Sequence, residues 1–196
     1  MGCDPDKLNV EIIQMVRLVR GKEEIKMSKR TGNVVTIKDL IEDVGLDASR
    51  YFFAMRSIDT QMDFDMDLAT KKSNDNPVYY VQYAHARINS ILREYGQKIE
   101  KIDEYKTLNS EYTYNILAKL DNFKDIIELA ASKYAPHILT NYIYELSSLF
   151  HTFYAHERVL NEDKTYTMER LNLIAAVAQV IKNALNIIGV EAKEKM

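Results

Sequence analysis

The spacing of apolar residues predicts that most of the chain is helical. From Pro77 onward, apolar positions recur at steps of three and four, which gives an amphipathic helix one buried face. Asn76 and Pro77 suit the start of the first of these helices, and Gly96 suits its end. Further helices are expected over 114–123, 124–134, 136–153 and 168–188. These segments predict an all-helical bundle.

Residues before this bundle follow a different pattern. Residues 8–19 are apolar with few breaks and rich in β-branched side chains, which favours a buried strand, with a helix as the alternative. A hairpin turn is expected near Gly21, and two short helices should follow, capped by Thr36 and by Asp47. The fold class expected is therefore mainly α, with a small α/β part before the bundle.

The polar residues between Lys72 and Asn76 suggest where these parts meet. We expect two domains, 1–73 and 74–196. Alternating acidic residues over 62–67 could suggest a cation site, but they lack the glycine and terminal glutamate of a calcium loop. A short extended segment that leads into a helix explains them better, and no metal site is expected.

Charge and cysteine content restrict the function classes. The chain has 26 Lys and Arg against 29 Asp and Glu, a net charge of −3, which argues against a general polyanion binder. Basic residues are concentrated over 17–38, so contact with a nucleic acid should be local. Cys3 is the sole cysteine, which excludes an internal disulfide and suits the cytoplasm. Without a long apolar run or a signal peptide, a soluble protein with no membrane partner is expected.

One short basic stretch suits phosphate binding. It consists of Lys26, Met27, Ser28, Lys29 and Arg30, with Gly32 just after. The two lysine ammonium groups could follow the changing charge of a polyphosphate, and the serine hydroxyl could donate a hydrogen bond to it. For an arbitrary sequence of this kind, a solvated surface turn would be the more common explanation.

This stretch resembles the KMSKS signature of class I aminoacyl-tRNA synthetases, and the surrounding sequence resembles the arginyl-tRNA synthetase family. The stretches that carry the resemblance are 2–5, 17–21, 31–36, 47–53, 76–87, 153–154 and 158–160, together with the final Met196. None of the four histidines stands in the H-x-G-H signature of class I enzymes. The expectation is therefore a C-terminal portion of such an enzyme that does not aminoacylate alone.

The resemblance implies roles for the basic stretch. Lys26 and Lys29 would be catalytic and would stabilise charge on pyrophosphate. Together with Met27 and Ser28, they would bind ATP. The full-length enzyme would use ATP with Mg and attach arginine to its tRNA, and no ligand is expected to be bound to this portion alone.

The same resemblance places Tyr154, Arg158 and Met196 at the tRNA anticodon. Tyr154 and Arg158 stand four apart, which would put them on one helical face, where packing plus a surface charge is the common alternative. Tyr80 and Arg87 are further candidates for tRNA contact, because aromatic rings stack on unpaired bases and arginine binds phosphate. His85 is interpreted as a core histidine.

Other functions remain open from the residues alone. A stand-alone tRNA-binding module would leave the KMSKS-type stretch unexplained, and a helical interaction scaffold would bind no tRNA at any salt concentration. Asp47 and Arg50 resemble a D-A-x-R element of class I enzymes, but helix capping and a surface ion pair are the preferred interpretation from the residues. A monomer that binds tRNA and no DNA is the leading expectation.

Overall fold

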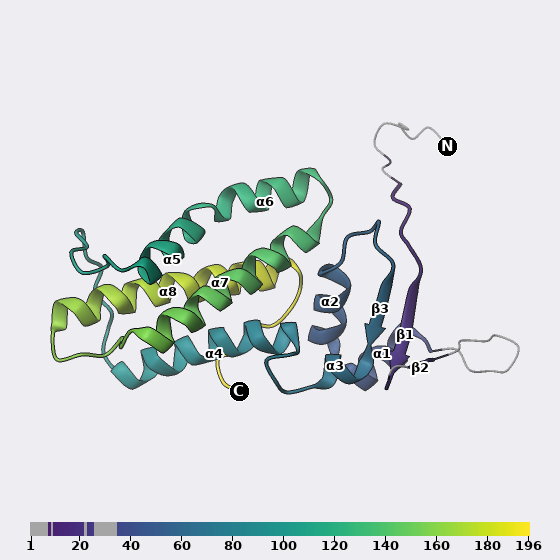
Figure 1. The fold of residues 1–196 in the computed structure, drawn as a ribbon, viewed down its shortest axis with the longest axis horizontal. Helices are drawn as coiled ribbons and strands as arrows, with labels where there is room; N and C mark the ends of the chain where they lie inside the picture. The colour runs from purple at the N-terminus through teal and green to yellow at the C-terminus, as the bar shows by residue number, and fades with distance from the viewer. Residues whose placement is uncertain (1–7, 9, 22, 26–34) are drawn as a thin grey trace, which may run out of the picture.

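A computed structural model describes residues 8, 10–21, 23–25 and 35–196, and these form a small sheet with three short helices followed by five longer helices (Figure 1). The KMSKS-type stretch, with Lys26, Met27, Ser28 and Lys29, lies outside the described residues. The expected fold class, mainly α with a small α/β part, is confirmed.

The sheet has the strand order β2-β1-β3. Its strands are β1 (Val16–Arg20), β2 (Glu23–Glu24) and β3 (Met62–Asp65). β2 returns antiparallel to β1, while β3 runs parallel to it with Leu18 opposite Phe64. The predicted hairpin turn is present at Gly21, whose φ of 58° lies in the left-handed region that glycine adopts without strain. Leu18 and Phe64 are buried and attach the sheet to the core.

The prediction of a buried strand over 8–19 is wrong for the residues before Val16. Only the part from Val16 onward pairs with neighbouring strands, and the apolar side chains before it are exposed, such as Ile12 at 82% and Met15 at 79%. A strand needs paired neighbours and a surface that covers its side chains. Among the described residues, β2 and β3 reach only the later part of this segment.

Three short helices cover this sheet region. They are α1 (Ile37–Val44), α2 (Leu46–Ala54) and α3 (Met66–Thr70). Thr36 caps α1 as predicted, in a reciprocal capping box with Asp39, and Gly45 ends it. The prediction that Asp47 caps α2 is wrong, because the N-cap is Gly45. Asp47 lies in the first turn of α2, and its carboxylate is used elsewhere.

Asn76 joins the end of α3 to the start of α4 (Pro77–Tyr95). Its Oδ1 accepts from the backbone N–H groups of Val78 and Tyr79, as the sequence predicted. Its Nδ2 also donates to the carbonyls of Ala69 and Lys71, at 3.0 and 2.9 Å. Asn76 is 3% exposed, so these two N–H groups and two carbonyls rely on its side chain, rather than on water, for these hydrogen bonds.

Replacing Asn76 with alanine is therefore expected to lower the free energy of unfolding by about 2 kcal/mol, more than loss of an ordinary exposed cap. Thr36→Ala, at the exposed start of α1, is the matched control and should cost about 1 kcal/mol. Urea unfolding followed by circular dichroism measures both. Equal losses in the two variants would contradict the bridging role of Asn76.

The bundle consists of α4 and four helices after it. These are α5 (Glu111–Asp121), α6 (Phe123–Ser132), α7 (Pro136–His156) and α8 (Lys164–Ile187). α7 lies between the others and packs against α4, α5, α6 and α8 (Figure 1). The break near 121–122 is as predicted, whereas α8 begins four residues earlier than expected because Asp163 caps it. Gly96 ends α4 with a left-handed φ of 66°.

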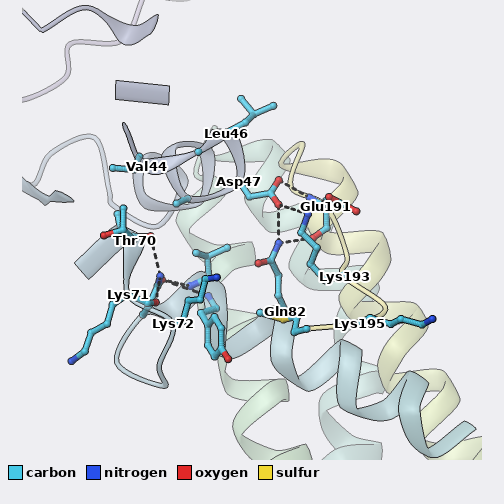
Figure 2. A pocket seen from close by; sticks show the side chains of 17 residues that line it. Val44, Leu46, Asp47, Thr70, Lys71, Lys72, Gln82, Glu191, Lys193 and Lys195 are labelled. Carbon is cyan, nitrogen blue, oxygen red and sulfur yellow. Dashed lines mark hydrogen bonds and ion pairs between the residues drawn. The ribbon is translucent and has the colours of Figure 1, made fainter. Parts of the chain in front are cut away.

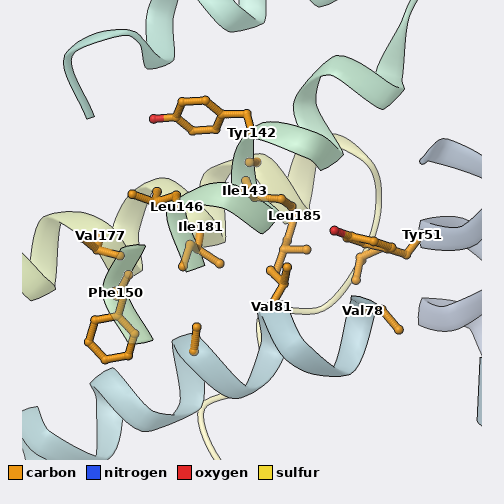
Figure 3. Packing of buried hydrophobic residues seen from close by; sticks show 14 of the residues in the cluster. Tyr51, Val78, Val81, Tyr142, Ile143, Leu146, Phe150, Val177, Ile181 and Leu185 are labelled. Atoms are coloured by element: carbon orange, nitrogen blue, oxygen red, sulfur yellow. The ribbon is translucent and has the colours of Figure 1, made fainter. Parts of the chain in front are cut away.

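A single hydrophobic cluster extends from the sheet into the bundle. Its centre lies where α4, α7 and α8 meet, around Val81, Ile143, Leu146, Phe150 and Ile181 (Figure 3). Tyr51 of α2 points into this cluster with 1% of its surface exposed, and its hydroxyl donates to the Thr140 carbonyl at 3.3 Å. α2 is thereby fixed to the bundle. None of the helices described is long and apolar enough to span a membrane.

Candidate nucleic-acid interface

Arg87 and Tyr154 form the centre of a polar and aromatic surface between α4 and α7. The Arg87 guanidinium carbon lies 4.4 Å from the centroid of the Tyr154 ring, a cation–π distance. Its Nη1 donates to the Tyr83 hydroxyl at 2.6 Å. These two contacts fix the Arg87 side chain and hold the Tyr154 ring in one orientation.

Two adjoining cavities border Tyr154, and we call them together the α4–α7 groove. The larger has a volume of about 490 Å³ and is lined by Arg87, Arg93, Lys195 and Met196 among others. The smaller, of about 280 Å³, is lined by Arg158 and Leu160 among others. Tyr154 lines both, as do Ile91 and Glu94. The groove therefore contains four of the five residues predicted to contact tRNA: Arg87, Tyr154, Arg158 and Met196.

Arg158 reaches the groove by a different route from the one predicted. Helix α7 ends at His156, and Glu157 is already extended, with φ −126° and ψ 133°. Tyr154 and Arg158 are therefore not on one helical face, which corrects the spacing argument. Arg158 is exposed and also borders a further hollow with Asn161 and Glu162. Both residues still line the same cavity.

Glu157, which precedes Arg158, is held by a buried ion pair. Arg170 of α8 donates to Glu157 Oε2 through Nε at 2.9 Å and through Nη2 at 2.6 Å. The side chains are 3% and 11% exposed. The Arg170 guanidinium also lies 3.2 Å from the Tyr166 ring centroid, and Ser110 donates to the second oxygen of Glu157. This arrangement fixes the backbone from which Arg158 extends.

Glu169 lies beside this ion pair and is fully buried. It accepts the backbone N–H groups of Lys106 and Thr107 at 2.8 and 2.7 Å, and the Thr107 hydroxyl at 2.7 Å. Burial alone would raise the pKa of Glu169, but these donors outweigh it and hold the pKa below its ordinary value. No local pattern in the sequence predicted this cluster, because the partners of Glu169 lie 62 and 63 positions away, in the segment between α4 and α5.

Met196 is brought to the groove by the segment that follows α8. This C-terminal segment, residues 188–196, runs back along α4. The Nδ1 atom of His85 lies 2.8 Å from the carbonyl oxygen of Lys193. Arg93 donates to the Glu194 carbonyl at 3.1 Å. Met196 is 54% exposed at the end of the segment.

His85 has the structural role that the sequence predicted. It is 2% exposed, and burial lowers its pKa below its ordinary value, more than the bond to the Lys193 carbonyl raises it. A neutral ring with its proton on Nδ1 satisfies this carbonyl. His85 therefore acts as a packing and hydrogen-bonding residue.

Tyr80, the fifth predicted contact residue, lies apart from the groove. Its ring packs against those of Tyr144 and His151, with centroids 5.0 and 4.7 Å apart. His151 in turn stacks on Tyr83, at 5.8 Å, so an aromatic chain connects Tyr80 to the groove. This arrangement suits packing between α4 and α7 more directly than contact with a ligand.

The charges along the groove favour an anionic partner. Arg87, Arg93, Arg158 and Lys195 line it, against Glu94 and the Glu157 carboxylate that is already paired with Arg170. The local excess of positive charge contrasts with the net charge of −3 of the whole chain. Such a surface attracts the phosphates of a nucleic acid locally.

Comparisons with known proteins show which families the chain is similar to. Residues 81–196 match the family described as "DALR anticodon binding domain". Residues 16–127 match the family described as "tRNA synthetases class I (M)". The whole chain is 50% identical to arginine–tRNA ligase 1 of Halalkalibacterium halodurans and 52% identical to arginine–tRNA ligase of Listeria monocytogenes serovar 1/2a. The chain spans 36% of the length of these curated relatives.

Solved structures give the same result. The whole chain superimposes with a TM-score of 0.87 and 34% identity on 42% of a protein assigned as an arginyl-tRNA synthetase from Campylobacter jejuni. Arginyl-tRNA synthetase from Plasmodium falciparum matches 83% of the chain with a TM-score of 0.70 and 27% identity, over 29% of its own length. The chain belongs to the arginyl-tRNA synthetase family, with a DALR anticodon-binding domain that follows part of a class I synthetase domain.

Proposed function

We propose that this chain binds the anticodon arm of an arginine-accepting tRNA in the α4–α7 groove. The observation that supports this most directly is the position of Tyr154, which borders both cavities, with Arg87 and Met196 in one and Arg158 in the other. Proteins recognise unpaired RNA bases by stacking them on aromatic rings and by placing guanidinium groups on bases or phosphates. Anticodon bases are unpaired and are therefore suitable ligands.

Each groove residue has a distinct part in this proposal. Arg87 holds the Tyr154 ring from α4, so that a base can stack on the ring without first ordering it. Arg158 provides an exposed guanidinium for a phosphate or a base edge. Met196 contributes a flexible apolar contact in the larger cavity.

For the whole protein we propose ATP-dependent attachment of arginine to its tRNA. Lys26 and Lys29 would stabilise the negative charge that develops on pyrophosphate, and Met27 and Ser28 would complete the contacts with ATP. Magnesium would accompany ATP as part of the substrate. In this proposal residues 1–73 belong to the synthetase domain and 74–196 to the anticodon-binding domain of a monomeric, cytoplasmic enzyme.

Binding of arginine-accepting tRNA to the purified chain tests the anticodon proposal. A tRNA with a changed central anticodon base is expected to bind about 5- to 150-fold more weakly, since base-specific contacts contribute about 1–3 kcal/mol. Both affinities should fall as salt rises, because phosphate contacts release counterions. Equal affinity for both tRNAs would contradict anticodon recognition, and no binding at any salt concentration would favour the interaction scaffold.

A further inference from the structure

The C-terminal segment returns to α2 before it reaches the groove. Gly189 turns the chain at the end of α8 with a left-handed φ of 69°, and the buried Val190 donates its N–H to the Leu185 carbonyl at 2.9 Å. The next N–H, that of Glu191, donates to Asp47 Oδ1 at 3.0 Å (Figure 2). A residue 144 positions earlier in the chain therefore fixes the beginning of this segment.

Gln82 connects the same carboxylate to α4. Its Nε2 donates both to Asp47 Oδ2 at 2.9 Å and to the Glu191 carbonyl at 2.8 Å (Figure 2). An amide nitrogen carries two hydrogens, so both are used. Gln82 is 6% exposed, and the Lys193 ammonium lies 3.5 Å from Asp47 Oδ2. Asp47 thus joins α2, α4 and the C-terminal segment at one point.

After this point, contacts with α4 hold the segment. The contacts of His85 and Arg93 with backbone carbonyls keep it alongside the helix until Lys195 and Met196, which form one wall of the larger cavity. The side chains of Glu194, Lys195 and Met196 are exposed. Few apolar contacts therefore compensate for the conformational entropy that this segment loses when it is ordered.

We propose that Asp47 is a positioning residue that, through Gln82 and the C-terminal segment, sets the place of the Lys195–Met196 wall of the α4–α7 groove. Arg50, three residues after Asp47 in α2, supports the chain reversal at Gly189. Its guanidinium lies against Gly189, where an added Cβ would be 2.5 Å from Nη1 of Arg50. Asp47 and Arg50 lie outside the residues that match the anticodon-binding domain. The shape of the groove therefore depends on a carboxylate of the synthetase part.

Amide hydrogen exchange tests the position of the segment without tRNA. Asp47→Ala removes the acceptor of the Glu191 N–H, and exchange at Glu191 is expected to become about tenfold faster or more. Asp75→Ala is the matched control, because it removes a carboxylate that pairs with Lys71 between α3 and α4. It should leave the exchange rate of the Glu191 amide unchanged. The amide of Ile181, in the core of α8, reports whether the fold is intact.

Unchanged exchange at Glu191 in a folded Asp47→Ala protein would overturn the proposal. If Asp47→Ala does not fold, Gln82→Ala removes the connecting amide and should accelerate exchange at Glu191. Unchanged exchange at Glu191 in a folded Gln82→Ala protein would then overturn the proposal. Faster exchange confined to the segment is the result that supports it.

The consequence for tRNA rests on the proposed function and has its own measurement. Asp47→Ala is expected to weaken binding of arginine-accepting tRNA by about tenfold. Removal of residues 191–196 from the Asp47→Ala protein should weaken its tRNA binding no further, because both changes act through the Lys195–Met196 wall. Additive losses would overturn this mechanism. If the unaltered chain binds no tRNA, the proposed function fails, while the exchange rates still decide whether Asp47 holds the segment.

Discussion

Replacing Arg170 with methionine is expected to lower the free energy of unfolding by about 3–5 kcal/mol, the range measured when one partner of a buried ion pair is removed. Arg170 donates to Glu157 through two nitrogens and to Thr107 through two more contacts, at 3.0 and 3.3 Å. Without it, the Glu157 carboxylate remains largely buried and loses its charged partner. Methionine keeps much of the side-chain volume, so the loss reports the charge and its hydrogen bonds.

Urea unfolding followed by circular dichroism measures this effect. Arg56→Met, at an exposed position after α2, is the control for loss of an arginine and should change stability by less than about 0.5 kcal/mol. Adding Glu157→Leu to Arg170→Met should restore part of the stability, because no buried charge then lacks a partner. A loss in Arg170→Met no larger than in the control would contradict a buried, stabilising pair.

Replacing Tyr154 with alanine is expected to weaken binding of arginine-accepting tRNA by about 5- to 150-fold, since stacking of one base on an aromatic ring contributes about 1–3 kcal/mol. The change removes the ring shared by the two cavities and also the partner of the Arg87 guanidinium. The fold should remain, because Tyr154 is only partly buried at the edge of the hydrophobic cluster.

Two variants make this result specific. Tyr154→Phe keeps the ring and should bind tRNA nearly as well as the unaltered chain. Tyr114→Ala removes a tyrosine of α5 that is 60% exposed and lines neither cavity of the groove, and it should leave affinity unchanged. Affinity that is lost equally in Tyr114→Ala and Tyr154→Ala would argue against a stacking role for Tyr154.

Local signals in the sequence predicted much of this fold. The caps at Thr36 and Asn76, the left-handed glycine at Gly96 and the stripe that includes Val81 all depend on residues within a few positions of one another. Such features are set by hydrogen bonds and side-chain spacing that a sequence displays directly. Several helix boundaries followed from them, but α5 and α8 begin three and four residues earlier than predicted, because Ser110 and Asp163 were not recognised as caps.

Features that depend on distant residues were not predictable in this way. Asp47 suited a helix cap locally, but its carboxylate instead binds the Glu191 N–H and Gln82. The apolar residues before Val16 suited a buried strand, but the described part of the chain provides no surface that covers them. Arg158 leaves the helix on which its spacing would place it, because α7 ends at His156. In each case a tertiary contact or its absence outweighed the local pattern.

Arg158→Ala tests whether the α4–α7 groove recognises the anticodon. Its affinity should be measured for arginine-accepting tRNA and for the same tRNA with a changed central anticodon base, at two salt concentrations. Lys124→Ala, which removes one exposed charge from α6, is the control for charge. We expect the difference between the two tRNAs to disappear in Arg158→Ala and to persist in the control. A difference that persists undiminished in Arg158→Ala would contradict recognition of the anticodon by this residue.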